Sequence, residues 1–371
     1  MTRVCHLTSV HQPDDVRIFI KECCSLSAAG FETHLVVPET ESCLKNGVAI
    51  HAIPQKNHGR LWRMTAMSWK IYICAKSLHA DIYHIHDPEL LPYGILLKAS
   101  GKKIIYDVHE DVPRDIESKH WIPTWLRRPV SSIFEQVENI CARQLTAVVT
   151  ATPHIGRRFA RINPSTITVN NYPIRGELHA SDRSVGFSAD VRPYVCYAGG
   201  IDDIRGAREM ISAISRTDIQ LLLAGSFSSN DLKCEVMSLP GWKQVEFVGQ
   251  VSRPELAVAL NQSFAGLILY HPETNHINAQ PNKIFEYMSA GIPIIVSDFP
   301  LWRALVERIG CGICVDPFDV QAIADAITKL AANREQARAM GERGLLSVTQ
   351  HYNWESEQSA LINLYSRLVN N

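Results

Sequence analysis

The sequence is short of three features that would mark other classes of protein. No apolar run approaches the roughly 20 residues that a helix needs to cross a bilayer, and the opening MTRVCHLTSV has the pattern of a strand rather than of a secretion signal. The formal net charge of −1 provides no excess of cations for neutralising nucleic acid phosphates. The ten cysteines show no disulfide-like spacing. These absences predict a cytoplasmic protein that does not bind nucleic acid.

Apolar residues, by contrast, are plentiful and regularly spaced. With 46% hydrophobic residues among 371, the chain can bury large cores and is long enough for two domains. Short apolar runs alternate with amphipathic helical patterns along nearly the whole chain. The expected strands cover residues 4–10, 33–37, 48–53, 81–86, 103–108 and 147–150, and then 194–197, 219–223, 245–248, 265–269, 292–296 and 312–315. Each series predicts an α/β domain with a doubly wound parallel sheet.

The boundaries between these parts follow from composition. We predict an N-terminal Rossmann-like domain over residues 1–175, a polar linker over 176–193, a second Rossmann-like domain over 194–350, and a final helix over 351–371 that packs back on the first domain. The first 175 residues carry a net charge of +5 and the remainder −6. Because ligands bind at the carboxyl ends of the strands in such sheets, the two domains are expected to offer two walls of one cleft.

A glycine pair opens the second domain. Residues 195–214, VCYAGGIDDIRGAREMISAI, have the pattern of a strand, a Gly-Gly turn and a helix. Gly199 and Gly200 would let the backbone approach a ligand closely, and the helix after Gly206 would direct free N–H groups at an anion. Arg205 adds a positive charge. This pattern predicts phosphate binding, and the alternative is a tight turn with a solvated arginine.

A second polar group lies in residues 278–298, NAQPNKIFEYMSAGIPIIVSD. Asn282 is expected to cap a short helix that ends at Gly291. Lys283 in the first turn is unfavourable against the helix dipole unless an anion lies nearby, although it could also point into solvent. Glu286, one turn further, can accept hydrogen bonds from two vicinal hydroxyls such as those of a ribose. A diphosphate and a sugar together predict a nucleotide.

In this order and spacing, AGGIDDIRG, LLLAGSF, VEFVGQVSRPEL and PNKIFEYMSAGIPIIVSD resemble the nucleotide-binding domain of glycosyltransferase family 4, whose members are retaining enzymes with the GT-B fold. HQPDDVRIFIKECCSLSAAGFETHLV, DIYHIHDPELLP and KKIIYDVHEDVP resemble the acceptor-side domain of the same family. The resemblance implies transfer of a hexose from a UDP- or GDP-linked sugar to a glycan or lipid-linked acceptor. It implies no metal and no cofactor besides the donor.

The resemblance also implies roles for single residues. Arg205 and Lys283 would hold the donor diphosphate, Glu286 the ribose, and the segment from Gly249 to Val251 the base. The catalytic residues would be these two cations together with His109, which would contact the transferred sugar. The rest of the donor site would be formed by Gly199, Gly200, Asn278 and Asn282.

The sequence departs from the family pattern at two positions. Many members have another glutamate eight residues before the position of Glu286, where this chain has Asn278, and a common arginine in the first glycine turn is here Gly200. Asn278 can hydrogen-bond a sugar hydroxyl but carries no charge. The donor sugar is therefore undefined, and Arg205 and Lys283 are left with more of the phosphate.

Histidines and acids end two strands of the first domain. His84 and His86 lie two apart on one strand face, and Asp107, His109 and the acids after it follow the next strand. Such a cluster would also suit zinc or a two-metal hydrolase. We predict no metal site, because His84 is expected to be a core histidine with its hydrogen bonds satisfied and because the resemblance implies a metal-independent enzyme.

The loop after the first strand is the expected acceptor site. His11, Asp15 and Arg17 follow that strand and open the first helix, where they would face the cleft. Acids at a helix start also suit the helix dipole, so capping is the alternative role. We predict acceptor binding for these three residues.

Residues 119–129, KHWIPTWLRRP, combine tryptophans with cations. This mixture suits an anionic membrane surface, which a lipid-linked acceptor would explain, and the alternative is a loop buried against its own domain. We therefore include a peripheral location on the inner face of the membrane.

Three other functions share part of this pattern. A nucleotide-sugar 2-epimerase has the same architecture but needs acid and base carboxylates in the cleft and no acceptor. A non-catalytic nucleotide-sugar-binding protein would bind the donor without turnover. A metal hydrolase would lose its activity with a chelator.

Overall fold

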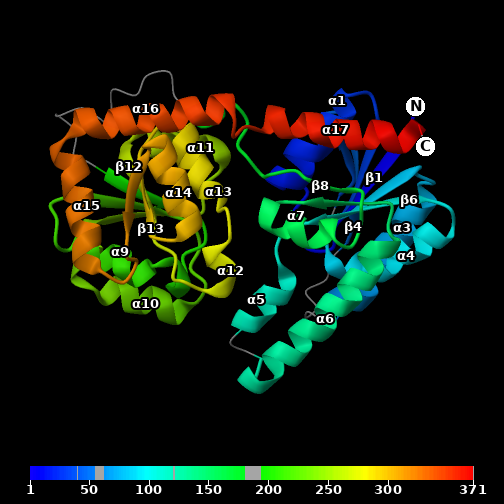
Figure 1. Cartoon of the computed structure of the whole chain (residues 1–371), viewed down its shortest axis with the longest axis horizontal. Coiled ribbons are helices and arrows are strands. Elements are labelled where there is room, and N and C mark those ends of the chain that lie inside the picture. The colour runs from blue at the N-terminus through cyan, green and yellow to red at the C-terminus, as the bar shows by residue number, and fades with distance from the viewer. Residues whose placement is uncertain (40, 55–61, 120–121, 180–193, 371) are drawn as a thin grey trace. The chain divides into compact units, whose positions relative to one another are not determined.

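Figure 1 shows the computed structural model of the chain, which describes residues 1–39, 41–54, 62–119, 122–179 and 194–370. The chain divides into two compact units. The N-terminal unit comprises Met1–Asn171 together with Trp354–Asn371, and the C-terminal unit comprises Tyr172–Asn353. The division thus falls at Asn171, where the sequence placed it at residue 175. Most of the predicted linker, residues 180–193, lies outside the described residues.

The N-terminal unit is built on an eight-stranded sheet in the order β3-β4-β2-β1-β5-β6-β7-β8. Its strands are β1 (Arg3–Leu7), β2 (Glu32–Pro38), β3 (Cys43–Lys45), β4 (Val48–Ile53), β5 (Ile82–Ile85), β6 (Lys103–Val108), β7 (Ala147–Thr150) and β8 (Thr166–Thr168). All neighbours run parallel except β3 and β4. The sequence pattern did not reveal β3 and β8, because three residues at a sheet edge give too short an apolar alternation.

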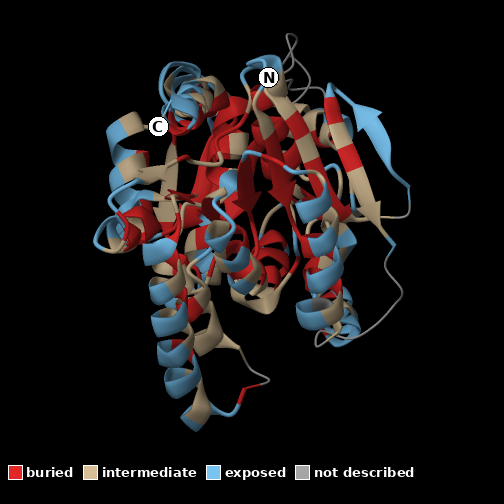
Figure 2. Ribbon diagram, turned by 90° about the vertical axis from the view of Figure 1, so that its right-hand side faces the viewer, coloured by how far each residue is buried: buried red, intermediate tan, exposed pale blue. Residues whose placement is uncertain are grey.

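Helices cover both faces of this sheet, and the central strands between them are buried, as the red ribbons of Figure 2 show. The helical segments of the unit are η1 (Val16–Cys23, a π-helical segment), α1 (Cys24–Ala28), η2 (Arg63–Met67), α3 (Ser68–Ser77), η3 (Pro88–Leu90), α4 (Leu91–Ala99), α5 (Val112–Ser118), α6 (Thr124–Gln144), α7 (Pro153–Ala160) and α17 (Trp354–Asn370).

Helix α17 comes from the far end of the chain but belongs to the N-terminal unit. Its Leu361, Leu364, Tyr365 and Leu368 form one buried face at helical spacing. At its start, Trp354 Nε1 donates a hydrogen bond to Ser25 Oγ over 2.9 Å. The helix therefore contributes side chains to the same core as the first strands.

The C-terminal unit has a six-stranded, wholly parallel sheet in the order β11-β10-β9-β12-β13-β14. Its strands are β9 (Tyr194–Ala198), β10 (Gln220–Ala224), β11 (Val245–Gly249), β12 (Ser263–Ile268), β13 (Ile294–Ser297) and β14 (Gly312–Val315). Its helical segments are η4 (Asp203–Arg205), α9 (Ala207–Ile214), α10 (Asn230–Ser238), η5 (Pro240–Gln244), α11 (Arg253–Asn261), α12 (Thr274–Ile277), α13 (Asn282–Ser289), α14 (Pro300–Ile309), α15 (Val320–Ala332) and α16 (Arg334–Gln350).

Side chains of the central strand β9 alternate between two cores of this unit. Val195 and Tyr197 pack with residues of α9 and α15, whereas Cys196 packs with residues of α11 and α13. A strand buried on both faces is apolar at every position, which is why these strands appear in the sequence as continuous apolar runs. The predicted fold class, two α/β domains with parallel sheets, is confirmed.

Each sheet has one switch point, a central strand from which the strand order runs in opposite directions along the sheet. In the C-terminal unit β9 lies between β10 and β12, and in the N-terminal unit β1 lies between β2 and β5. The loops after such strands diverge, and ligands of α/β proteins bind in the crevice that they leave. The functional residues are therefore expected after β9 and β12, and after β1 and β5. None of the described helices has the length and apolarity that crossing a bilayer requires.

Candidate functional site

The glycine turn after β9 brings both predicted phosphate-binding cations together. A Cβ atom placed on Gly199, whose φ is +131°, would collide with Nζ of Lys283. A Cβ atom on Gly200 would lie 2.7 Å from Nη1 of Arg205. The two glycines therefore leave the room in which the cations lie, although Lys283 comes from α13, far along the sequence.

Neither cation is neutralised by a carboxylate. Lys283 Nζ donates to the Tyr270 hydroxyl over 3.3 Å and lies 5.3 Å from the centre of the Tyr197 ring. Arg205 Nη1 donates to the Gly200 carbonyl at 3.4 Å, and the guanidinium lies 5.7 Å from the Tyr270 ring centre. In the described part of the chain no carboxylate forms an ion pair with either residue. Two partly buried positive charges of this kind favour an anion between or beside them.

The backbone after Arg205 is fixed by a third glycine. Gly206 has a φ of +77° and directly precedes helix α9. A Cβ atom there would collide with the carbonyl oxygen of Leu269, the residue after β12. The turn and the end of β12 are therefore in close contact, and this contact places the start of α9 beside the two cations.

The predicted ribose ligand Glu286 has a partner that sequence reasoning missed. Arg253 Nη1 donates to Glu286 Oε1 at 2.5 Å, while Arg253 Nε and Nη2 donate to the two carboxylate oxygens of Glu177 at 2.8 and 2.7 Å. Within the described residues no group bonds to the second carboxylate oxygen, Glu286 Oε2. The carboxylate is therefore held in place by Arg253 and keeps one oxygen for a ligand hydroxyl.

The remaining donor-site candidates lie at the ends of nearby elements. Gly249, with a φ of +71°, ends β11, and Val251 follows it, partly buried. Asn278 is exposed just after α12. The prediction that Asn282 caps helix α13 is wrong, because α13 begins at Asn282 itself. The residue at the cap position is Pro281, and no side chain caps the helix there. Asn282 is exposed, and it could contact a ligand from its place in the first turn of α13.

In the N-terminal unit the structure buries Arg17. Its side chain is 4% exposed, and it donates to both carboxylate oxygens of Asp107, at 2.9 and 2.8 Å, and to the carbonyl of Val169 at 2.9 Å. This placement corrects the prediction that Arg17 binds the acceptor, because its guanidinium is buried and hydrogen-bonded to Asp107 and Val169. Burial alone would raise the pKa of Asp107, but Arg17 holds that pKa well below its usual range.

Asp15 has the capping role that was the alternative to acceptor binding. Its Oδ1 accepts hydrogen bonds from the backbone N–H of Arg17 and Ile18, at 2.9 and 2.8 Å, and so starts η1. His11 Nδ1 lies 3.1 Å from Asp15 Oδ2. Burial would raise the pKa of Asp15, but these hydrogen bonds from His11 and Ile18 lower it. His11, with a 28% exposed side chain, remains the more accessible acceptor candidate of the loop.

His109 lies at the exposed end of a chain of hydrogen bonds. Its Nε2 is 2.8 Å from Asp107 Oδ2 and 3.2 Å from His86 Nδ1, and its side chain is 17% exposed. Its ring centre is 5.1 Å from that of His11. Because Asp107 holds one ring nitrogen, the other nitrogen of His109 is oriented for a ligand. The structure therefore brings His109 and His11 together.

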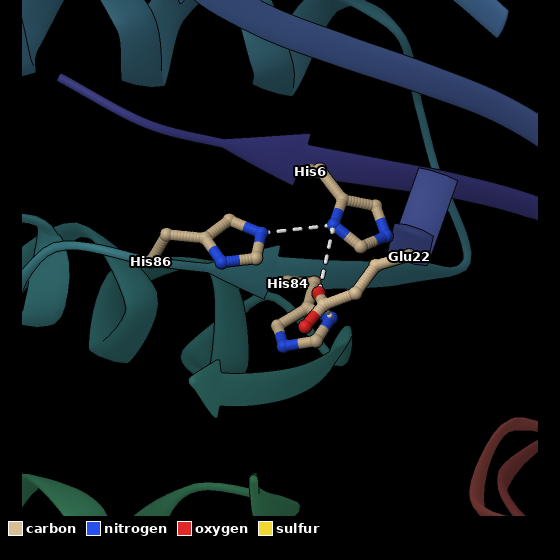
Figure 3. Close-up of side chains that lie close together, drawn as sticks. All are labelled: His6, Glu22, His84 and His86. Carbon is tan, nitrogen blue, oxygen red and sulfur yellow. Dashed lines mark hydrogen bonds and ion pairs between the residues drawn. The ribbon is translucent and has the colours of Figure 1, made fainter. Parts of the chain in front are cut away.

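Behind His86 lies a fully buried cluster that includes residues that sequence reasoning did not nominate (Figure 3). His6 Nδ1 is 2.9 Å from His86 Nε2, and the Tyr365 hydroxyl of α17 bridges His6 Nε2 at 3.2 Å and His84 Nδ1 at 2.7 Å. Burial lowers the pKa of all three histidines, that of His86 to about 4, and so favours their neutral forms. Glu22 of η1 completes the cluster, and burial raises its pKa.

The predicted membrane segment is only partly described. Residues 120–121, which include one of its tryptophans, lie outside the described residues. Ile122 is buried and Leu126 partly buried, whereas Trp125 is 74% exposed at the start of α6. The segment is therefore neither wholly buried nor wholly exposed.

The two domains and their paired switch points define the GT-B class of glycosyltransferases. Sucrose-phosphate synthase from Thermosynechococcus elongatus has a similar structure, with a TM-score of 0.81 at 17% identity over 100% of both chains. HepE from Anabaena, solved in complex with UDP, gives a TM-score of 0.71 at 13% identity over 99% of this chain and 100% of that one.

Sequence comparison gives the family. Residues 19–171 match the model described as Glycosyltransferase Family 4, and residues 181–346 match Glycosyl transferases group 1. The chain belongs to glycosyltransferase family 4, as its motifs predicted. A phosphatidyl-myo-inositol mannosyltransferase from Mycobacterium leprae is 24% identical over 163 residues, 41% of this chain. The matched part spans 39% of the length of that curated relative.

Proposed function

We propose that the chain is a retaining hexosyltransferase that moves a sugar from a nucleotide-sugar to a glycan or lipid-linked acceptor. The observation that carries this proposal is the meeting of Arg205 and Lys283 at the Gly199–Gly200 turn, where no carboxylate in the described residues neutralises them. Cleavage of the donor leaves negative charge on the diphosphate, and fixed cations stabilise that charge without reorganising. These cations take the role of a divalent ion, so the transfer step needs no metal and no cofactor.

The family resemblance supports retention, and the residues suit its front-face route. In this route the leaving phosphate oxygen takes the proton of the acceptor hydroxyl as the acceptor oxygen bonds to the sugar. No carboxylate nucleophile is then needed, in keeping with Asn278 in place of an acid. His109, with one nitrogen held by Asp107, is the proposed contact to the transferred sugar.

The donor is proposed to be UDP-linked, with GDP as the second choice. HepE, similar in fold, was solved with UDP and with UDP-glucose. In this chain Glu286 would accept from the ribose through the oxygen that Arg253 leaves open, and the segment from Gly249 to Val251 would contact the base. The name of the mycobacterial relative supports a lipid-linked acceptor.

An exposed apolar face on α6 supports a lipid surface as partner. Val130, Ile133, Val137 and Ile140 recur every three or four residues and are 39–64% exposed. Arginines precede this stripe in the 119–129 segment, which would favour anionic lipid. We place the enzyme in the cytoplasm at the inner face of the membrane, a reducing compartment that suits its ten free cysteines.

The test is a calorimetric screen of UDP-, GDP- and ADP-sugars, followed by turnover with candidate acceptors. Binding of one donor and release of free nucleotide only when acceptor is present would support transfer. Conversion of the donor without acceptor would favour the 2-epimerase. Binding without any turnover would favour a nucleotide-sugar-binding protein.

A further inference from the structure

The core of the N-terminal unit holds four metal-ligand side chains in one place. His6, Glu22 and His84 are fully buried and His86 is 3% exposed. His6 and His84 are paired in register on the neighbouring strands β1 and β5, His86 follows two positions later, and η1 places Glu22 beside them (Figure 3). One ligand atom from each residue lies within 4.8 Å of those of the others.

Two of these side chains have unmet polar atoms. Neither oxygen of Glu22 has a hydrogen-bond partner among the described residues, and His84 Nε2 has none either. The nearest cation, Arg17 Nε, is 3.2 Å from Glu22 Oε1, but that guanidinium is engaged by Asp107. Glu22 is thus ion-paired with Arg17 but makes no hydrogen bond among the described residues, and a buried polar atom without a hydrogen bond is costly. His84 is thus not the satisfied core histidine that the sequence predicted.

We propose that His6, Glu22, His84 and His86 bind one divalent transition-metal ion of the zinc class. Three imidazoles and one carboxylate are a ligand set that such ions prefer. His6 Nδ1 is 2.9 Å from His86 Nε2 and 3.9 Å from Glu22 Oε2, which is also 3.9 Å from His84 Nδ1. Ligands of tetrahedral zinc are about 3.3 Å apart, so small side-chain shifts complete the site.

The outer contacts of His6 and His86 suit this role, whereas His84 Nδ1 is 2.7 Å from the Tyr365 hydroxyl, which would have to release it for the ion. His86 Nδ1 lies 3.3 Å from Asp107 Oδ2, and His6 Nε2 lies 3.2 Å from the Tyr365 hydroxyl. When these outer nitrogens carry the protons, His6 Nδ1 and His86 Nε2 face each other as two lone pairs, the arrangement that a cation between them stabilises.

The ion would have a structural role. It would join β1, β5 and η1, and through Tyr365 it would fix α17 on the same core. The proposal does not rest on the proposed function, because the donor diphosphate is assigned to Arg205 and Lys283 of the other unit.

The test measures metal in the full chain, purified without a histidine tag because such tags bind zinc. We expect about one zinc ion per chain by elemental analysis, and visible absorption bands of four-coordinate cobalt after replacement by Co²⁺. Glu22→Gln keeps the size of the side chain but removes the charge, and should weaken zinc binding at least about tenfold in competition with a chelator.

His51→Ala is the matched control. His34 Nδ1 and His51 Nε2 are also 2.9 Å apart on two strands of the same sheet, but without a buried carboxylate beside them. This variant should keep the full metal content. Because Glu22→Gln itself could impair folding, the wild-type melting temperature with and without zinc gives a second measurement, and added zinc should raise it. A folded wild-type protein that takes up neither zinc nor cobalt, or equal metal content in wild type and folded Glu22→Gln, would overturn the proposal.

Discussion

The two units balance their charged clusters in opposite ways. In the C-terminal unit Arg205 and Lys283 meet hydroxyls, aromatic rings and a carbonyl, and no carboxylate within the described residues. In the N-terminal unit Arg17 is enclosed by the carboxylates of Asp107 and Glu22. All three cations stand near the start of a helical segment in the sequence. Their partners, rather than their residue type or position, separate a cation that is open to a ligand from a structural one.

This difference has a physical consequence for mutation. A cation that a ligand neutralises can be removed from the ligand-free protein with little loss of stability. A buried cation that two carboxylates surround cannot, because its removal leaves uncompensated charge in the core. Stability and donor binding should therefore respond to different residues in the two units.

The largest effect is expected from Arg17→Met. The variant leaves Asp107 and Glu22 without their guanidinium, so the free energy of unfolding should fall by about 3–5 kcal/mol. Urea unfolding followed by circular dichroism measures it. Arg303→Met is the control, since Arg303 pairs with Asp298 on the surface with a side chain 49% exposed, and its loss should change the free energy of unfolding far less. Equal losses in the two variants would contradict the assignment of Arg17 to the core.

The next effect concerns the open cations. Lys283→Ala and Arg205→Ala should each weaken binding of a nucleoside diphosphate by about 1.5–3 kcal/mol, tenfold or more, because each removes a charge-assisted contact. Binding of the nucleoside alone should change little. Calorimetry with both ligands measures the difference.

Arg208→Ala provides the control for this pair. Arg208 lies in the first turn of α9, three residues after Arg205, but is bound to Glu235 on the surface. Its removal should leave diphosphate binding unchanged. Equal losses for nucleoside and nucleoside diphosphate in Lys283→Ala and Arg205→Ala would remove both residues from the phosphate site.

The sequence was sufficient for the fold and for the Gly-Gly turn because both have local signals. Strands buried on both faces appear as apolar runs, and Gly199, Gly200 and Arg205 are close in sequence. The placement of Lys283 beside them was predictable only through the family resemblance, since that residue arrives from another helix.

The partners of the charged residues were not predictable in this way. Glu286 and Arg253 are 33 residues apart, and His84 and Tyr365 are 281 apart. Nothing local in the sequence joins such pairs, because the parallel sheet and the returning helix α17 bring them together. For the same reason the sequence could not separate capping from acceptor binding at Asp15, where both roles need an acid at a helix start.

A smaller effect is expected at Glu286. Glu286→Gln replaces one acceptor oxygen by a donor and removes the charge. The free energy of nucleotide-sugar binding should therefore weaken by at most about 1.5–3 kcal/mol. A 2′,3′-dideoxy donor should lose much less, because it has no ribose hydroxyls to offer. Measuring both donors with both proteins gives a coupling energy.

Glu177→Gln separates this role from simple support of Arg253. Glu177 binds Nε and Nη2 of the same arginine, whereas Glu286 binds its Nη1. If Glu286 only holds Arg253, both variants should weaken the natural and the dideoxy donor alike. A coupling energy near zero in Glu286→Gln, with an unchanged circular dichroism spectrum, would show that Glu286 does not bind the ribose.

The smallest expected effect is that of a chelator on turnover, and it tests the two units at once. If Arg205 and Lys283 supply the positive charge at the diphosphate, as proposed, excess EDTA in the assay should leave the rate unchanged. Loss of an ion from the histidine cluster of the N-terminal unit should instead lower the melting temperature, since a ligand that binds only the folded state stabilises it. The two readings are taken on the same EDTA-treated sample, before and after zinc, magnesium or manganese is added back. If magnesium or manganese restores a rate that EDTA abolished while the melting temperature stays constant, a divalent ion belongs to the diphosphate site, and the contrast between an open cationic site and a closed structural one is wrong.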